Sequence, residues 1–125
     1  MSVQLNHTIV HVSDKNRAAE EVADILGVSP PTSYGPFLVL TLANGVSLDF
    51  ADDHGQPDAQ HYAFLVDEDE FDAIWRRIRD RGLTFWADPF HRRPGEINTN
   101  DGGRGLYWAG PDGHNLEIIT VPYGG

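Results

Sequence analysis

At 125 residues the chain is long enough to bury the core of one domain of ordinary size. It contains no cysteine, which excludes a disulfide framework and thiolate metal ligands. A formal net charge of −10 argues against nucleic acid or an anionic membrane as a partner, because both attract basic surfaces. No apolar stretch approaches the roughly 20 residues that cross a bilayer, and no signal peptide is expected. We therefore expect a soluble, cytoplasmic protein.

The first half of the chain predicts strands around one helix. Gly27 can stop that helix, Asn44-Gly45 is typical of a hairpin turn, and residues 52–58 indicate a linker. The expected elements are a strand over 3–12, a helix from Ser13 or Asp14 to about Leu26, a strand near Tyr34, and strands over 37–43 and 46–51.

The second half repeats this plan. Asp67 to Glu70 form an acidic first turn, which favours the positive end of a helix, and Gly82 ends the helical pattern. The expected elements are a strand over 61–66, a helix that buries Phe71, Ile74, Trp75 and Ile78, and strands over 84–90, 104–109 and 115–121.

One short pattern occurs in both halves. Residues 44–50 read NGVSLDF and residues 112–118 read DGHNLEI, so each copy has a turn, two residues, then Leu, an acid and a large apolar residue. Such internal repetition makes Asp49 and Glu117 equivalent. An acid among apolar strand residues is costly to bury unless a partner compensates its charge.

Side chains alternate between the faces of a strand, so parity indicates which residues lie together. In the strands that carry the repeat, and in the first strand of each half, one face is bulky and apolar and suits packing under a helix. The opposite faces carry His7 and His61 in the first strands of the two halves, and Asp49 and Glu117 in the last. If these faces converge, the four side chains meet.

This pattern resembles the vicinal oxygen chelate superfamily, also called the glyoxalase/bleomycin resistance protein/dioxygenase superfamily. The residues that carry the resemblance are Asn6-His7, Gln60-His61 and, most specifically, GRGLYW at 103–108 followed by GPDGHNLE at 110–117. The resemblance covers nearly the whole chain. It implies an α+β fold in which two βαβββ modules, about 1–52 and 59–125 of a single domain over 1–125, form a half-open eight-stranded mixed β-barrel flanked by helices.

The resemblance also implies a divalent metal ion held by His7, His61, Glu117 and Asp49. Asp49 is the shorter acid and is expected as a fourth ligand or as a base, since several relatives bind metal through three residues. Imidazoles and carboxylates suit iron, manganese, nickel, cobalt or zinc and leave positions open for substrate oxygens. Tyr107 stands where ring-cleaving relatives have a pocket tyrosine, so we expect Glu117, Asp49 and Tyr107 to be catalytic.

Three functions fit the resemblance. The first is a glyoxalase-like lyase or isomerase, in which Asp49 or Glu117 moves a proton between adjacent carbons of a small oxygen-rich substrate. The second is an extradiol ring-cleaving dioxygenase that uses iron(II). The segment 106–117 fits its signature except at Gly110, but residues 98–100 offer no histidine where an acid–base catalyst is wanted. His91 lies too far upstream in sequence, unless the loop folds it back.

The third function is a non-enzymatic protein that sequesters a drug in an aromatic cleft, with Trp75, Trp86 and Trp108 as the aromatic surface. The candidate metal ligands favour an enzyme over this alternative. The resemblance implies a small-molecule substrate and a homodimer.

Two further features of the sequence have both a functional interpretation and a simpler one as solvent-exposed residues. The polar segment 88–101 is long for a loop in a compact domain, and such loops are usually functional or mobile. We expect it to form a wall of the substrate site, with Arg92 or Arg93 meeting an anionic group, or else to be a solvated loop. His114, in the turn before the last strand, is expected to cap the turn or face solvent.

Overall fold

The structure is a computed structural model and describes residues 2–124. The chain divides between Asp58 and Ala59 into two compact units, each with one helix and one four-stranded sheet. The α+β class and the βαβββ order of each module are confirmed. Hydrogen bonding divides the eight strands into two separate sheets and does not close them into a barrel. That the two units make up a single domain stays a prediction.

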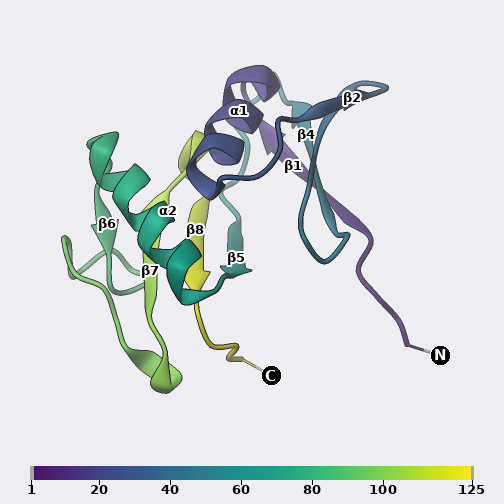
Figure 1. The fold of residues 1–125 in the computed structure, drawn as a ribbon. Coiled ribbons are helices and arrows are strands. Elements are labelled where there is room, and N and C mark those ends of the chain that lie inside the picture. Colours follow the sequence, from purple (N-terminus) through teal and green to yellow (C-terminus); the bar gives the residue numbers. More distant parts are fainter. Residues whose placement is uncertain (1, 125) are drawn as a thin grey trace. The chain divides into compact units, whose positions relative to one another are not determined.

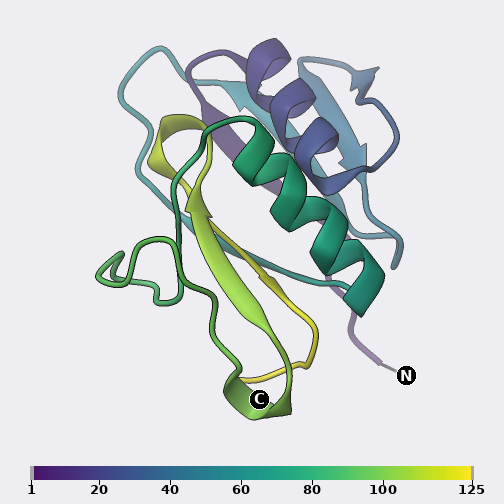
Figure 2. The same cartoon turned by 60° about the vertical axis from the view of Figure 1, so that its left-hand side comes forward.

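The first unit contains a mixed sheet in the order β1-β4-β3-β2 (Figure 1). β1 and β4 are parallel, and the other pairs are antiparallel. Figure 2 shows α1 lying along this sheet, and its contacts are with β3, β4 and β1. The elements are β1 (His7–Val12), α1 (Lys15–Leu26), β2 (Thr32–Tyr34), β3 (Phe37–Thr41) and β4 (Ser47–Asp52).

Burial in the first sheet follows the predicted parity. Val10 and Val12 of β1 are buried, whereas His7 and Ile9 on the alternate face are exposed. Because β1 pairs with β4 in the register His7 to Ser47 and Ile9 to Asp49, the side chains of His7 and Asp49 belong to the same face of the sheet. The apolar core therefore lies on the other face, against α1.

The helix α1 begins and ends where its residues predict. The Asp14 carboxylate accepts a hydrogen bond from the backbone N–H of Arg17, which satisfies one of the free donors of the first turn. Gly27 then adopts a left-handed conformation at φ 73° and donates to the carbonyl of Ala23.

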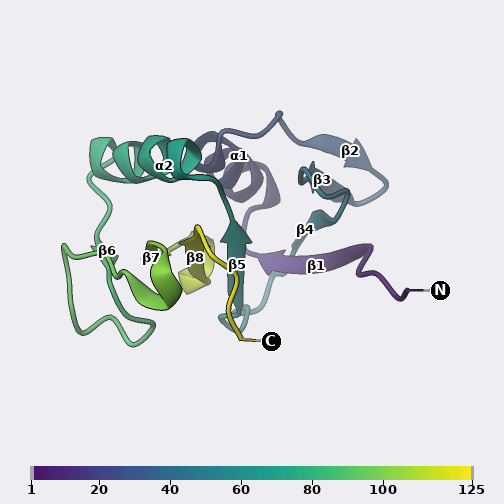
Figure 3. The same ribbon diagram turned by 60° about the horizontal axis from the view of Figure 1, so that its bottom comes forward.

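The second unit repeats this arrangement in the order β5-β8-β7-β6, with β5 and β8 parallel. Figure 3 shows α2 on one side of this sheet. The core between them contains Phe71, Ile74 and Ile78 of the helix, and Trp108 and Ile118 of the sheet. The elements are β5 (His61–Leu65), α2 (Glu68–Asp80), β6 (Phe85–Trp86), β7 (Gly105–Ala109) and β8 (Asn115–Ile119), with 3-10 turns at Asn100–Gly102 and Pro111–Gly113.

The start of α2 is held by a complete capping box. The Asp67 carboxylate accepts from the backbone N–H of Glu70, and the Glu70 carboxylate accepts in return from the N–H of Asp67. The acidic first turn complements the helix dipole, as expected. Gly82 at φ 70° lies just beyond the end of the helix and permits the turn away from it.

Two predicted strands differ most from the observed ones, while the others agree to within two residues at each end. The strand expected over 3–12 begins only at His7, where pairing with β4 begins. The strand expected over 84–90 consists of Phe85 and Trp86 alone. The Asp88 carboxylate accepts from the backbone N–H groups of Arg92 and Arg93, and this local competition folds the chain into a loop instead of a strand.

No helix among the described residues is long and apolar enough to cross a membrane.

Candidate functional site

The second unit brings one predicted histidine and one predicted acid into contact. β5 and β8 pair in the register His61 to Asn115 and Ala63 to Glu117, so the two side chains share a face and lie diagonally to each other. The Nε2 atom of His61 is 3.1 Å from Oε1 of Glu117. Glu117 is only 1 % exposed, whereas the His61 side chain is about half exposed at 46 %.

The hydrogen bond made by Nδ1 of His61 shows whether Nε2 can carry a proton in a neutral ring. Nδ1 lies 2.8 Å from the backbone carbonyl oxygen of Asn115, and a carbonyl can only accept, so Nδ1 carries a proton. The Nε2 atom of a neutral ring therefore presents a lone pair to the carboxylate of Glu117. Two electron-rich atoms at this distance require a cation, which is either a proton on Nε2 or a metal ion shared by both atoms.

The separation of the two atoms suits a shared metal ion. Imidazole nitrogens and carboxylate oxygens bind metals such as zinc at about 2.1 Å. Two such ligands at the right angles of an octahedral site are about 3 Å apart, close to the 3.1 Å between His61 Nε2 and Glu117 Oε1, which is also an ordinary hydrogen-bond length. The Asn115 carbonyl also orients the ring, as outer partners of metal-binding histidines do. The chemistry of these two residues therefore suits two of the ligands of a divalent metal ion.

Two tyrosines surround the Glu117 carboxylate. The hydroxyl of Tyr123 donates to Glu117, 2.7 Å from Oε1 and 2.9 Å from Oε2. The hydroxyl of Tyr107 lies 3.4 Å from that of Tyr123, and the Tyr107 ring stacks beside His61 with centroids 6.0 Å apart. Burial, and then hydrogen bonding with Tyr123 and Glu117, raise the pKa of Tyr107 far above its ordinary value. Tyr107 is therefore a neutral hydroxyl at physiological pH.

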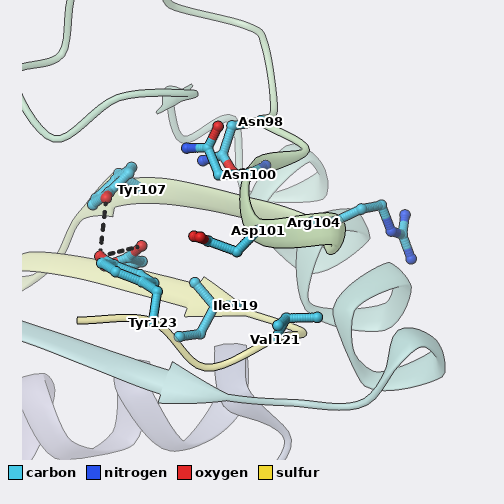
Figure 4. A pocket seen from close by; sticks show the side chains of 9 residues that line it. Asn98, Asn100, Asp101, Arg104, Tyr107, Ile119, Val121 and Tyr123 are labelled. Atoms are coloured by element: carbon cyan, nitrogen blue, oxygen red, sulfur yellow. Dashed lines mark hydrogen bonds between the residues drawn. The ribbon is translucent and has the colours of Figure 1, made fainter. Parts of the chain in front are cut away.

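A cavity of about 380 Å³ opens beside this carboxylate, entirely within the second unit (Figure 4). Ile119 and Val121 give it an apolar side, and the Asp101 carboxylate points toward the two tyrosine hydroxyls. The lining residues are Asn98, Asn100, Asp101, Arg104, Tyr107, Glu117, Ile119, Val121 and Tyr123.

The charge of this cavity is negative. Asp101 and Glu117 both line it, and Arg104 is the cation among its lining residues. The Arg104 guanidinium, however, points away from the other side chains in Figure 4 and binds Glu68 at 2.9 Å and Asp72 at 2.8 Å. Its charge is therefore already compensated by α2, and the cavity disfavours an anionic ligand.

The long segment over residues 88–101 contributes to the cavity through its second part. Asn98, Asn100 and Asp101 line the cavity. That this segment forms a wall of a substrate site stays a prediction. The two arginines take other contacts. Arg93 pairs with Glu96 at 2.9 Å, and the Arg92 guanidinium lies 5.4 Å from the ring centre of Phe90. A role for Arg92 or Arg93 toward an anionic group stays a prediction.

The first unit holds the other two predicted residues in the equivalent register. His7 and Asp49 take the places that His61 and Glu117 take in the second sheet. The Nδ1 atom of His7 donates to the side-chain oxygen of Asn6 at 2.8 Å, which again leaves Nε2 as the free lone pair. Asp49 is half-buried and accepts from the hydroxyl of Ser47 at 3.1 Å.

Within the described part of the first unit, no hydrogen bond or ion pair joins His7 to Asp49. Among all described residues, no group of three or more His, Asp or Glu side chains is arranged to hold a metal ion. His61 and Glu117 are thus the pair that the structure brings together, and a ligand set that includes His7 and Asp49 stays a prediction.

Sequence reasoning missed Tyr123, and the structure now places two histidines whose positions the sequence left open. Tyr123 follows the last strand in a segment without secondary structure, where periodicity carries no signal. His114 is only 2 % exposed, and its Nδ1 accepts from the backbone N–H of Gln60, so the expectation that it could face solvent was wrong. His91 folds back, stacks on Trp86 at 3.7 Å, and contacts the side-chain oxygen of Asn115 at 3.0 Å.

Of the three tryptophans expected for a drug-binding cleft, Trp108 is excluded from the surface, while Trp75 and Trp86 are half-buried, so the drug-binding alternative stays a prediction. Trp108 is fully buried at 0 % exposure, and the indole N–H of Trp75 is buried as well. Trp86 is occupied by its stacking partner His91.

The chain is similar to several known proteins. Residues 4–118 match the family model of the Glyoxalase/Bleomycin resistance protein/Dioxygenase superfamily. The chain is 62 % identical to the solved structure of Oxidase ChaP-H1, with a TM-score of 0.97, covering 99 % of this chain and 100 % of that one. For Oxidase ChaP-H2 the identity is 62 % and the TM-score 0.96, with 99 % and 98 % covered.

A curated relative is the Glutathione transferase FosA of Serratia marcescens. It is 29 % identical over 124 residues, which cover 94 % of this chain and 81 % of that protein. With the family match over nearly the whole chain, these findings confirm the resemblance inferred from the motifs. The chain belongs to the glyoxalase/bleomycin resistance protein/dioxygenase superfamily, also called the vicinal oxygen chelate superfamily.

Proposed function

We propose that this protein is a divalent-metal-dependent oxidase that acts with dioxygen on a small, uncharged, oxygen-rich substrate. The observation that carries the proposal is the contact of the His61 lone pair with the buried Glu117 carboxylate, which requires a cation between or on these groups. The choice of oxidase is supported by the 62 % identity to ChaP-H1 and ChaP-H2, which are named oxidases.

The proposed metal ligands are His7, His61 and Glu117, with Asp49 as a fourth ligand or a base. Two histidines and one carboxylate suit iron(II) and leave positions open, although manganese, nickel, cobalt and zinc accept the same donors. Once bound, the metal ion would hold vicinal oxygens of the substrate and supply the redox chemistry. In support, His7 and His61 each have Nδ1 engaged by an oxygen acceptor, so each presents Nε2.

The cavity beside Glu117 is the proposed substrate site. Tyr107 is held neutral by its raised pKa and offers its hydroxyl as a hydrogen-bond donor or acceptor for a substrate oxygen. The Asp101 carboxylate can accept from a substrate hydroxyl at the opposite side of the cavity. A metal ion would offset the charge of Glu117, but Asp101 remains in the lining and Arg104 is paired with α2, which favours a neutral polyhydroxylated compound over an anion.

The second candidate is a glyoxalase-like lyase or isomerase, or a thiol transferase like FosA. The half-buried Asp49 favours it, because this carboxylate could serve as the base that such chemistry needs. A ring-cleaving extradiol dioxygenase is a further variant of the oxygen-dependent proposal. A homodimer and a cytoplasmic location are expected from the sequence and remain predictions.

The test measures dioxygen uptake by protein purified without a histidine tag and reconstituted anaerobically with iron(II), manganese(II) or zinc(II). A simple catechol serves as the uncharged probe and a phosphorylated phenol as the anionic one. We expect oxygen uptake with iron(II) and the catechol, and loss of this uptake in His61→Ala. His54→Ala, in the linker between the two units, is the matched control and should retain activity.

Three outcomes decide between the candidates. Oxygen uptake that depends on His61 supports the oxidase. Oxygen-independent conversion of a glutathione adduct of an α-ketoaldehyde, or oxygen-independent addition of glutathione to an epoxide, supports the second candidate. A wild-type protein that retains no metal ion after reconstitution would contradict both.

A further inference from the structure

Tyr123 supplies the hydroxyl donor to the Glu117 carboxylate. Its O–H lies within hydrogen-bond distance of both carboxylate oxygens, at 2.7 and 2.9 Å, and the carboxylate is 1 % exposed. A buried carboxylate needs such a donor, because it has left the hydration that stabilised its charge. His61 can donate to the carboxylate only when Nε2 carries a proton, and not when that nitrogen binds a metal ion.

The donor comes from outside the regular structure. β8 ends at Ile119, and Tyr123 lies four residues further along, in a segment with neither helix nor strand. Its side chain lines the cavity, and the residue is 49 % exposed. In Figure 4 its hydroxyl is joined to the hydroxyl of Tyr107 and to the Glu117 carboxylate.

We propose that Tyr123 is a positioning residue that holds the Glu117 carboxylate with Oε1 toward His61 Nε2 and thereby sets the affinity of this site for a divalent metal ion. The inference rests on the metal pair of the proposed function. Both oxygens lie near the one hydroxyl, so a metal ion can take Oε1 while Tyr123 keeps its hydrogen bond to Oε2.

The hydroxyl of Tyr123 lies 2.7 Å from Oε1, the oxygen that faces His61, and 2.9 Å from Oε2. When a metal ion binds Oε1, the hydrogen bond moves to Oε2, which is already within its reach. Hydrogen bonds to a ligating carboxylate fix its orientation, and their loss typically costs about 10–100-fold in metal affinity. The half-exposed ring, in turn, is a wall of the cavity whose removal would open the site to water.

The variant Tyr123→Phe removes the hydroxyl and keeps the ring. The full chain, without a histidine tag and stripped of metal, is titrated with cobalt(II), whose visible absorption reports the geometry of its ligands. We expect the affinity for cobalt(II) to fall about 10–100-fold, with a changed absorption band as Glu117 reorients. The metal-free variant should keep its fold, because the ring still packs, but its melting temperature should fall, because the buried Glu117 carboxylate loses a donor.

Tyr34→Phe is the matched control. It makes the same chemical change at a tyrosine on β2 that is 74 % exposed. Its cobalt(II) affinity and spectrum should equal those of wild type.

The remaining outcomes separate the two proposals. Unchanged or tighter cobalt(II) binding by Tyr123→Phe overturns the positioning role, while wild-type binding that is lost in Glu117→Gln leaves the metal proposal intact. A fall in affinity with an unchanged cobalt(II) spectrum would show that the hydroxyl stabilises the fold without orienting Glu117, and would overturn the inference. Absence of cobalt(II) binding by the wild-type protein overturns both proposals.

Discussion

The two units have the same sheet register, but only in the second unit does the histidine contact the acid. In each unit a histidine on the first strand lies diagonally to an acid on the last strand, with one strand pair parallel in both. In the second unit His61 and Glu117 are in contact at 3.1 Å. In the first unit Asp49 bonds instead to Ser47, its neighbour two residues earlier on the same strand.

This difference teaches that backbone register alone does not make a site. Glutamate is one methylene longer than aspartate, so the same diagonal can be spanned by Glu117 and not by Asp49. The second unit also surrounds its acid with two tyrosine hydroxyls, one from β7 and one from the segment after β8. The first unit keeps the backbone of the repeat, and the second unit adds the polar surroundings that fix its acid.

Loss of the buried acid should have the largest effect. Glu117→Gln keeps the shape and removes the charge, so we expect cobalt(II) affinity to fall by more than the roughly 10–100-fold typical of outer-shell changes. The metal-free protein should remain folded, because the amide can still accept from Tyr123. Competition titration with a chelator measures the affinity, and near-wild-type affinity would contradict the assignment of Glu117 as a ligand.

Changes at Asp49 test the side-chain length argument directly. Asp49→Glu gives the first unit the acid of the second, and we expect metal affinity to rise several-fold. Asp49→Asn should lower affinity by about tenfold or less, in the range of an outer-shell partner rather than a principal ligand. The same titration checks both, and a larger loss in Asp49→Asn than in Glu117→Gln would reverse the ranking of the two units.

Alkaline pH should weaken the tyrosine surroundings of the second unit. Burial, with the Glu117 carboxylate nearby, raises the pKa values of Tyr107 and Tyr123 above the ordinary tyrosine value. A raised pKa means that the folded state favours the neutral phenol. The stability that it contributes is therefore full below about pH 10, the unfolded value, and is lost as the pH rises above that toward the folded pKa.

Denaturant unfolding of the metal-free protein from pH 8 to pH 11 measures this effect. The fall in unfolding free energy above about pH 10 should be shallower in Tyr107→Phe than in wild type, with Tyr34→Phe as the exposed control. Identical slopes for all three proteins would show that burial of Tyr107 does not govern the alkaline transition.

Removal of the helix caps should give the smallest difference between the units, measured as the loss of unfolding free energy. Asp67 belongs to a reciprocal capping box on α2, whereas Asp14 makes a single cap contact on α1. We expect Asp67→Ala to lower the unfolding free energy by about 1–2 kcal/mol and Asp14→Ala by about 1 kcal/mol or less. Thermal or urea unfolding measures both, and equal losses would indicate that Glu70 adds nothing to the cap.

Much of the fold could be predicted from the residues because local chemistry decides it. The capping residues Asp14 and Asp67 and the turn glycines Gly27 and Gly82 act within a few residues of their own positions. The turn–Leu–acid repeat predicted that Asp49 and Glu117 are equivalent, and the strand registers confirm it. These signals depend on hydrophobic periodicity and turn preference, which can be read from the order of the residues.

The surroundings of the acids were decided by tertiary structure. Tyr123 has no periodic pattern, and its hydroxyl reaches Glu117 only because the chain turns back after β8. The expected strand over 84–90 gave way to a loop, because Asp88 satisfies the backbone of Arg92 and Arg93. The sequence by itself determined the repeated register and the chemistry of its acids. Only the folded chain decided that Glu117 reaches its histidine, because that contact depends on side-chain length and on residues distant in sequence.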